Sequence, residues 1–310
     1  MNSILGITNK NFFNNYWGKK HYLAKGHFSD IENSLSIEQL KTIIDKNRKT
    51  LNYPLIRLVR NGKVIPEFKI TEKKTTEREG EKKQLSISKL NKLLNDGCTL
   101  VINAIERYND NVSNIKTKFE QIFKETIQVN LYLSQPKTFG FNLHYDPHEV
   151  FIIQLAGEKE WELYDFTIEK PLRNQRYFSE QPPEKINTKV TLTKGDVLYV
   201  PRGMWHKAES INKSSLHLTV GVYAMTKFDI INRTIQELQN QVRFREYMRN
   251  STQFKNGVKN LSKKEIQDII ANAIDSLQEM LVDSEITEVC NDYHHKKTVF
   301  SEKINIPFIY

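Results

Sequence analysis

The region from residue 126 to residue 225 carries the hydrophobic period of β-strands. From Ile127 to Leu133 apolar residues occupy every odd position, and Gln128, Asn130 and Tyr132 the even ones. This alternation is typical of a strand with two different faces. Further strands are predicted at residues 150–156, 159–165, 189–193, 196–200 and 216–223. Short strands with turn residues between them predict an antiparallel barrel or a double-sheet jelly roll.

The part of the chain before this region, residues 1–125, predicts an α/β segment that packs on the barrel. Residues 10–28 are aromatic and basic, and we expect them to pack on the later strands. Residues 69–84 are charged and almost free of apolar groups, which predicts an exposed loop, either a solvated connector or a flap over a site. The other predicted elements are a helix begun by the capping box at Ser36, a hairpin at 55–65, a helix at 88–95, a strand at 99–105 and a helix at 112–125.

The part after the strands, residues 226–310, predicts a helical region. Apolar residues from Phe228 to Val242 are spaced alternately three and four apart, the pattern of one amphipathic helix. Ser262 and Glu265 form the ends of a second capping box, which predicts another helix. These helices either close against the barrel or form a dimerisation region.

Composition limits the cellular setting and the partners. The chain has 310 residues, enough for one large domain with an appendage or two modest domains. It has no apolar run long enough to span a membrane, and its start lacks the pattern of a signal peptide. Cys98 and Cys290 are its only cysteines, which favours a reducing cytoplasm. The net charge of +9 does not collect into one basic block, so direct nucleic-acid binding is not indicated.

Two histidines and an aspartate form a pattern suited to a metal. His144 and Asp146 are two positions apart, so in an extended strand their side chains would point to the same side. His206 follows a predicted turn, a strand and a Pro-Arg-Gly bend. Two histidines and one carboxylate are the ligands that hold one face of a non-haem Fe(II). Pro147 interrupts the strand, so His148 and Glu149 are poorer candidates than Asp146.

A lysine and several polar residues predict a cavity beside this metal site. Lys159 has the strand parity of Trp161 and Leu163, so we expect its ammonium group inside the barrel, where it needs an anion. The distal carboxylate of 2-oxoglutarate would be such an anion. The polar faces of two other predicted strands contribute hydrogen-bonding groups, namely Asn130, Tyr132, Thr219 and His217. For His217 we expect a hydrogen-bonded core histidine or a partner of a ligand, not a metal ligand.

Four segments resemble the JmjC-type, cupin-fold oxygenases that depend on Fe(II) and 2-oxoglutarate, and most closely the ribosomal-oxygenase branch. They are QVNLYLSQP, GFNLHYDPHEVFIIQLAGEKEWELY, GDVLYVPRGMWHKAES and SLHLTVGVY, and NFFNNYWGKKHYL is similar to the N-terminal segment of that family. The resemblance implies a mainly β fold with α-helices, in which residues 126–225 form a double-stranded β-helix core. It also implies a homodimer formed through the helices after the core.

The resemblance also implies roles for individual residues. His144, Asp146 and His206 would be the iron ligands, and Lys159 would pair with the distal carboxylate of 2-oxoglutarate. Asn130 and Thr219 match polar residues that line the co-substrate pocket, and Tyr132 shares the face of Asn130.

The activity expected from these features is hydroxylation of an amino-acid residue in a protein or peptide, with O2 consumed and succinate and CO2 released. The peptide could be a natural-product precursor. Three alternatives stay open: an N-methyl-lysine demethylase, an oxygenase for a small metabolite, and a non-catalytic cupin-like scaffold that binds a structural metal.

Overall fold

The computed structural model describes residues 2–28, 35–76, 80–173, 181–246, 254–255, 258–259 and 262–282. The chain divides into two compact units, one formed by residues 1–224 and the other by residues 225–309. Each unit is described by itself. The predicted boundary between residues 125 and 126 stays a prediction, since both sides of it belong to the first unit.

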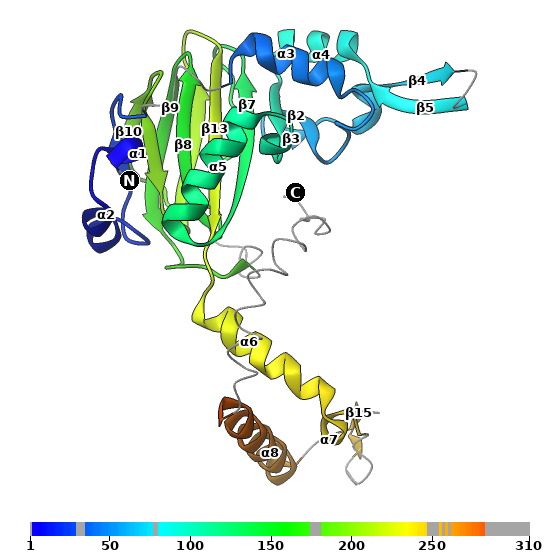
Figure 1. The fold of residues 1–310 in the computed structure, drawn as a ribbon, viewed down its shortest axis with the longest axis vertical. Helices are drawn as coiled ribbons and strands as arrows, with labels where there is room; N and C mark the ends of the chain where they lie inside the picture. Colours follow the sequence, from blue (N-terminus) through cyan, green and yellow to red (C-terminus); the bar gives the residue numbers. More distant parts are fainter. Residues whose placement is uncertain are drawn as a thin grey trace. The chain divides into compact units, whose positions relative to one another are not determined.

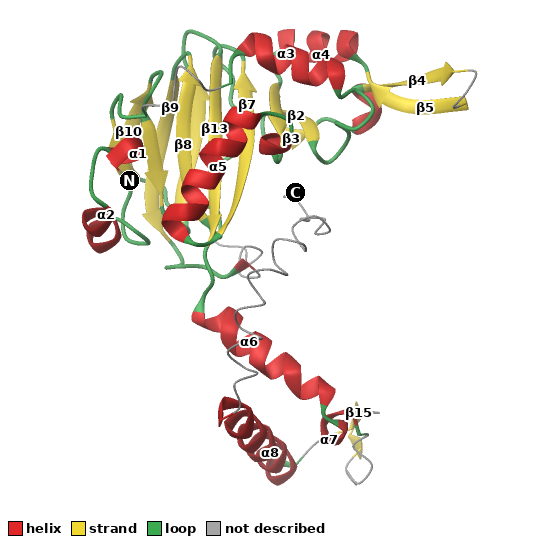
Figure 2. Ribbon diagram, in the orientation of Figure 1, coloured by secondary structure: helices red, strands yellow, loops and turns green. Residues whose placement is uncertain are grey.

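The first unit is built on two antiparallel sheets (Figures 1 and 2). The larger sheet has the strand order β1-β11-β8-β13-β7-β6-β2-β3, and the smaller sheet has the order β10-β9-β12. The strands are β1 Tyr22–Ala24, β2 Ile56–Arg60, β3 Lys63–Val64, β6 Thr99–Ile102, β7 Thr126–Ser134, β8 Glu149–Ala156, β9 Lys159–Phe166, β10 Ile186–Leu192, β11 Val197–Val200, β12 Met204–Ser210 and β13 Ser215–Tyr223.

An apolar layer joins the two sheets. Strands β8 and β11 of the large sheet and all three strands of the small sheet contribute to it, through Val150, Ile152, Leu198, Val200, Trp161, Leu163, Leu192 and Met204. The alternate residues of β8, such as Phe151 and Ile153, belong to a second core on the other face of the large sheet. Since both faces of β8 are buried, its sequence is a nearly continuous apolar run. The two sheets and their shared core confirm the predicted jelly-roll fold.

Aromatic side chains attach the N-terminal segment to the outer face of the large sheet. Helix α2 (Asn9–Asn15) begins at Thr8, whose hydroxyl accepts from the backbone N–H of Asn11. Its Phe12 is fully buried, with its ring centroid 4.9 Å from that of Tyr199. Burial of such a ring contributes about 1.5–3 kcal/mol. The predicted packing of residues 10–28 on the later strands is therefore confirmed. A short helix, α1 (Asn2–Leu5), precedes α2.

Helix α5 (Asp110–Phe123) covers the same face of the sheet (Figure 1). The side chain of Asn109 caps its start by accepting from the backbone N–H of Val112. Val112, Ile115 and Phe119 are its buried residues, three and four positions apart, and Phe119 lies 5.1 Å from Phe151 between ring centroids. This spacing is the amphipathic pattern from which the helix was predicted.

The remaining N-terminal elements extend the large sheet. Strand β6 pairs with β7, and β2 and β3 follow it, so residues from the first third of the chain form one end of the barrel sheet. Helix α3 (Ile37–Lys46) begins with the predicted capping box at Ser36, and α4 (Ile87–Asn95) is the predicted helix at 88–95. Two short 3-10 helices lie at Glu67–Lys69 and Ile105–Arg107.

The prediction of a loop at 69–84 is wrong. Strands β4 (Thr71–Thr76) and β5 (Gly80–Leu85) pair along their whole length in a hairpin that projects from the sheets (Figure 1). Its base is held by Ile70 and Leu85, which are buried. Apart from Gly80, the cross-strand partners above the base are polar or charged, so the hairpin lacks the alternating apolar residues by which strands are recognised.

The second unit contains helices, as predicted. Helix α6 (Lys227–Glu237) begins with a capping box at Thr226, and α8 (Lys263–Val282) begins after Ser262, whose hydroxyl accepts from the backbone N–H of Glu265. The prediction of a single helix from Phe228 to Val242 is wrong. Gln241 is extended between a 3-10 turn at Leu238–Asn240 and α7 (Val242–Arg245). The strands β14 (Phe254–Lys255) and β15 (Val258–Lys259) form a minimal hairpin. Residues 283–310 of the predicted helical region lie outside the described residues.

Several large apolar side chains of this unit are exposed. They are Phe228, Ile230, Ile231, Ile235, Val242, Ile266, Ile269, Ile270 and Ile274. Among the described residues, no helix has the length and apolar character needed to cross a membrane.

Candidate metal centre and cavity

The three predicted metal ligands come from two segments that lie side by side. His206 belongs to β12, and His144 and Asp146 belong to the connection between β7 and β8. The backbones of His144 and His206 exchange two hydrogen bonds, of 3.2 and 2.7 Å between nitrogen and oxygen. Residues 141–146 do not form one of the described strands, so the extended geometry considered for His144 and Asp146 is limited to this isolated bridge at His144. The bridge is nevertheless what brings residues 62 positions apart to one place.

The side chains of His144, Asp146 and His206 are arranged as a metal site. Their ligand atoms lie within 4.8 Å of one another. The Nδ1 atom of His144 lies 2.7 Å from the carbonyl oxygen of Asn142, and that of His206 lies 3.0 Å from the carbonyl oxygen of Met204. A carbonyl oxygen only accepts, so both Nδ1 atoms donate in these contacts, which leaves Nε2 of each ring as the nitrogen that would bind a metal. This donor set fits a divalent metal ion.

The charge of Asp146 also suits a metal ligand. Burial raises the pKa of its carboxyl, but the hydrogen bond with His206 and the neighbouring histidines His148 and His144 outweigh that effect. The pKa of Asp146 is therefore held well below its usual range. Its Oδ2 lies 3.5 Å from Nε2 of His206. An ionised carboxylate is the form of an aspartate that binds a metal ion.

Backbone contacts hold the bend before His206 against the segment that carries Asp146. The N–H of Gly203 donates to the carbonyl oxygen of Asp146 at 2.9 Å. Gly203 has a φ of +86°, and a Cβ there would lie 2.5 Å from Cδ of Pro171 and 2.8 Å from the carbonyl oxygen of Ile168. Both the left-handed backbone and the lack of space require glycine at this position.

A buried carboxylate supports the same bend. The Oε2 atom of Glu149 accepts from the hydroxyl of Tyr199 at 2.5 Å and from the backbone N–H of Arg202 at 3.2 Å. Tyr199 in turn accepts from the backbone N–H of Gly18 at 2.7 Å. Glu149 is thus engaged away from the metal ligands, as its low rank among the candidates implied. Sequence reasoning did not find this network, since its members are up to 181 positions apart.

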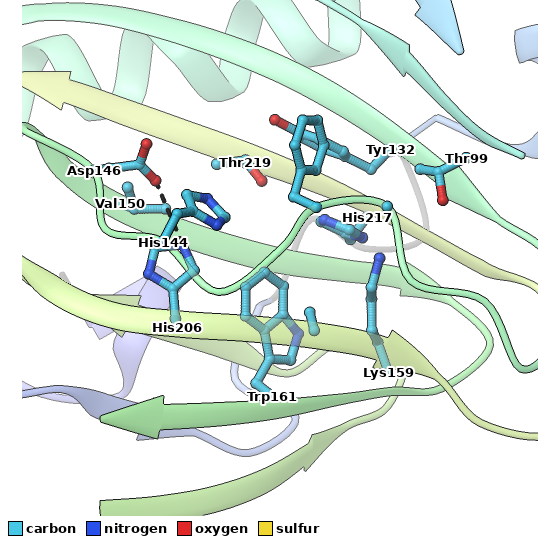
Figure 3. Close-up of a pocket in the computed structure, with 13 residues that line it drawn as sticks. Thr99, Tyr132, His144, Asp146, Val150, Lys159, Trp161, His206, His217 and Thr219 are labelled. Carbon is cyan, nitrogen blue, oxygen red and sulfur yellow. Dashed lines mark ion pairs between the residues drawn. The ribbon is translucent and has the colours of Figure 1, made fainter. Parts of the chain in front are cut away.

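A cavity extends from the three ligands to Lys159 (Figure 3). Figure 3 shows the ligands on one side and Lys159 on the other, with Trp161, Tyr132 and His217 between them. The cavity is lined by Thr99, Tyr132, Gly140, Phe141, His144, Asp146, Val150, Lys159, Trp161, His206, Ala208, His217 and Thr219.

Lys159 is buried at the end of this cavity, which confirms its predicted position inside the barrel. The residue is only 4% exposed, and its Nζ donates to the hydroxyl of Ser134 at 3.0 Å. Burial lowers the pKa of its ammonium group to about 7. Within the described part of the chain no carboxylate forms an ion pair with it. The ammonium group lines a cavity, and because a buried charge without a counter-ion is costly, an anion bound beside it would stabilise its charged form.

Two of the three other predicted co-substrate residues reach the cavity. Tyr132 and Thr219 line it from neighbouring strands of the large sheet. Asn130 does not: its side-chain oxygen accepts from the backbone N–H of Ala104 and from the amide of Gln128. It thereby supports the turn after β6, where Ala104 has a φ of +51°. A role of Asn130 in binding the co-substrate stays a prediction.

The cavity also contains residues that sequence reasoning did not assign. Thr99 comes from β6, and nothing in the sequence placed that strand next to β7. Phe141 and Ala208 come from the segments that carry the metal ligands. His217 lies outside the metal-ligand group, as expected, but the expectation that it is hydrogen-bonded is wrong, because its Nδ1 has no partner among the described residues.

Comparison with known proteins agrees with this geometry. The model of the JmjC domain matches residues 103–230. The chain is 28% identical over 288 residues to a bifunctional lysine-specific demethylase and histidyl-hydroxylase of Dictyostelium discoideum, which covers 88% of this chain and 54% of that protein. It is 37% identical over 130 residues to ribosomal oxygenase 2 of Rattus norvegicus, covering 40% of this chain and 27% of that protein. The chain thus spans about half or less of the length of these relatives.

Solved structures show the same fold. The chain superposes on ycfD of Escherichia coli with a TM-score of 0.58 and 17% identity, covering 92% of this chain and 70% of that one. YcfD in complex with cobalt and 2-oxoglutarate gives a TM-score of 0.57 at 16% identity, over 90% of this chain and 68% of that one. Residues 103–230 therefore match a JmjC domain, and the chain is similar in sequence to a histidyl-hydroxylase and a ribosomal oxygenase that are described as such.

Proposed function

We propose that this protein is an Fe(II)- and 2-oxoglutarate-dependent hydroxylase that acts on an amino-acid residue of a protein or peptide. One observation carries the proposal. A site of two histidines and one aspartate shares a cavity with a buried lysine, and the described residues provide that lysine with no anionic partner. A metal ion at the first site and a dicarboxylate anchored on the second would satisfy both.

The residues have separate tasks in this scheme. His144 and His206 would hold the iron through Nε2, and Asp146 through its carboxylate. Lys159 would bind the distal carboxylate of 2-oxoglutarate. When bound, Fe(II) and 2-oxoglutarate supply the activation of O2, with oxidative decarboxylation to succinate and CO2 coupled to hydroxylation. Val150 and Trp161 contribute apolar walls to the cavity, and such walls would limit the access of water to the bound co-substrate.

The substrate class follows from the relatives. Their names record histidyl hydroxylation, lysine demethylation and oxygenation connected with the ribosome. We therefore infer a polypeptide substrate, with hydroxylation of a side chain as the first candidate. Demethylation of an N-methyl-lysine is the second candidate, because the relative from Dictyostelium discoideum carries both activities in its name.

We also infer a homodimer formed through the second unit. Its helices α6 and α8 expose apolar side chains that water would otherwise surround, among them Ile231 and Ile270. A reducing compartment such as the cytoplasm is the inferred location, since the chain has two cysteines and Cys98 is free and buried.

Succinate formation tests the activity. Protein purified without oxygen is given Fe(II), 2-oxoglutarate and air, first alone and then with cell extract or with peptides containing histidine or N-methyl-lysine. We expect succinate from the wild type and none from His206→Ala, which removes one ligand. A mass increase of one oxygen in a peptide identifies hydroxylation, and release of formaldehyde identifies demethylation. Metal binding without succinate under all these conditions contradicts the proposal and favours a non-catalytic scaffold.

A further inference from the structure

His217 is a buried titratable residue to which the proposed function assigns no task. It lies on β13 and lines the cavity, and the residue is 2% exposed. Its ring stacks on Tyr132, with 4.9 Å between the centroids and 2° between the planes. Trp161 meets it edge-on at 5.7 Å. These two aromatic neighbours hold the imidazole in one orientation.

The ring nitrogens of His217 make no hydrogen bond within the described part of the chain. Its Nδ1 is fully buried and unpartnered. A buried polar atom without a partner is costly and is rare in folded proteins, where such atoms bond to protein, water or ligand. The metal ligands do not include His217. The described residues therefore leave its hydrogen-bonding capacity unused, on a residue that lines the cavity.

The charge state of His217 determines what it offers to a ligand. Burial and the neighbouring ammonium group of Lys159 hold the pKa of His217 well below its usual range. A neutral imidazole carries one N–H donor. Lys159 has three donors, of which the described residues use one, on Ser134. A carboxylate accepts several hydrogen bonds at once, so it suits a site with a cation and a directional N–H beside it.

We propose that His217 binds the distal carboxylate of 2-oxoglutarate together with Lys159, through its single ring N–H. This inference rests on the proposed function and adds a residue to it. Lys159 supplies the charge, and His217 supplies a donor of fixed direction. The stacking on Tyr132 then has a purpose beyond packing, since a preorganised ring loses little freedom when the ligand binds.

Binding measurements separate this role from simple packing. The full chain, loaded with Mn(II) without oxygen, is titrated by calorimetry with 2-oxoglutarate and with 2-oxopentanoate, which has the same carbon chain but no distal carboxylate. His217→Phe keeps an aromatic ring against Tyr132 and removes both nitrogens. We expect 2-oxoglutarate to bind this variant about 10- to 100-fold more weakly, the loss typical of a hydrogen bond to a charged group. Binding of 2-oxopentanoate and of Mn(II) should be unchanged.

Further variants serve as controls. His21→Phe makes the same change at a histidine outside the cavity lining and should leave all three affinities unchanged. His217→Asn and His217→Gln place an amide N–H near the positions of Nδ1 and Nε2 respectively, and the one that recovers affinity identifies the donor.

Two results overturn the proposal: equal binding of 2-oxoglutarate to wild type and His217→Phe, or an equal loss for both keto acids. If the wild type itself does not bind 2-oxoglutarate, the proposed function fails too.

Discussion

At the scale of single residues, the candidate site follows from the protonation of a few buried groups. Asp146 keeps its charge because neighbouring histidines outweigh its burial, whereas the pKa of Lys159 falls to about 7 because burial has no opposing anion. The carboxylate of Asp146 favours a bound cation, and the ammonium group of Lys159 favours a bound anion. The two ends of the cavity therefore prefer ligands of opposite charge.

The low pKa of Lys159 predicts a pH-dependent affinity for 2-oxoglutarate. Its free amine takes up a proton only below about pH 7, instead of the usual 10.5. Above pH 7 the amine must gain a proton when the carboxylate binds, so the affinity should fall by about tenfold per pH unit, and below pH 7 it should be flat. Calorimetry with 2-oxoglutarate on the Mn(II)-loaded protein between pH 6 and pH 9 measures this.

Lys159→Arg is the matched control, because a guanidinium stays charged over this range. Its affinity should vary little with pH, even if it is weaker overall. A wild-type affinity that does not change above pH 7 would contradict the assignment of Lys159.

At the scale of elements, the contacts between segments hold the three candidate metal ligands in place. In the bend after β11, the backbone N–H of Arg202 donates to Glu149. The hydroxyl of Tyr199 links Glu149 to the N-terminal segment at Gly18. Strand β11 was predicted from its own sequence pattern, whereas β12, which carries His206, was not. The link between the start of the chain and the bend before His206 was not predicted. A hydrogen bond between distant segments has no counterpart in local periodicity.

Tyr199→Phe tests this link. The variant keeps the buried ring but removes the hydroxyl between Gly18 and Glu149. We expect the free energy of unfolding to fall by about 1–3 kcal/mol, because a buried carboxylate and an N–H lose a partner. Mn(II) affinity should fall by about tenfold or more, as for other residues that orient metal ligands indirectly. Urea unfolding and Mn(II) titration measure the two effects.

Tyr22→Phe provides the comparison, since the hydroxyl of Tyr22 has no hydrogen bond among the described residues, and it should change neither quantity. Loss of stability in Tyr199→Phe with unaltered Mn(II) affinity would show that the network supports only the fold.

At the scale of the whole molecule, the two units differ in how they bury apolar residues. The first unit encloses its core between sheets and helices. The second leaves the isoleucines of α6 and α8 exposed, which a second copy of the chain would cover.

Ile270→Glu should therefore convert a dimer to a monomer in light scattering, because Ile270 is 52% exposed and gains a charge at the inferred interface. Gln267→Glu adds the same charge to the same helix, at an exposed polar position, and should remain a dimer. A wild type that is monomeric at micromolar concentration would exclude the inferred dimer.

The sequence alone determined many local features of this protein: most strands of the jelly roll, the helices begun by the capping boxes at Ser36 and Ser262, the three candidate metal ligands and the burial of Lys159. Each depends on residues close in sequence, whose spacing records which side faces the core. Only the tertiary structure decided which residues share the cavity. It brought Thr99 and His217 to Lys159, placed Asn130 under the turn at Ala104, and joined Gly18 to Tyr199. It also formed the β4–β5 hairpin from residues without an apolar face. These outcomes depend on pairing between distant strands, which local patterns do not encode.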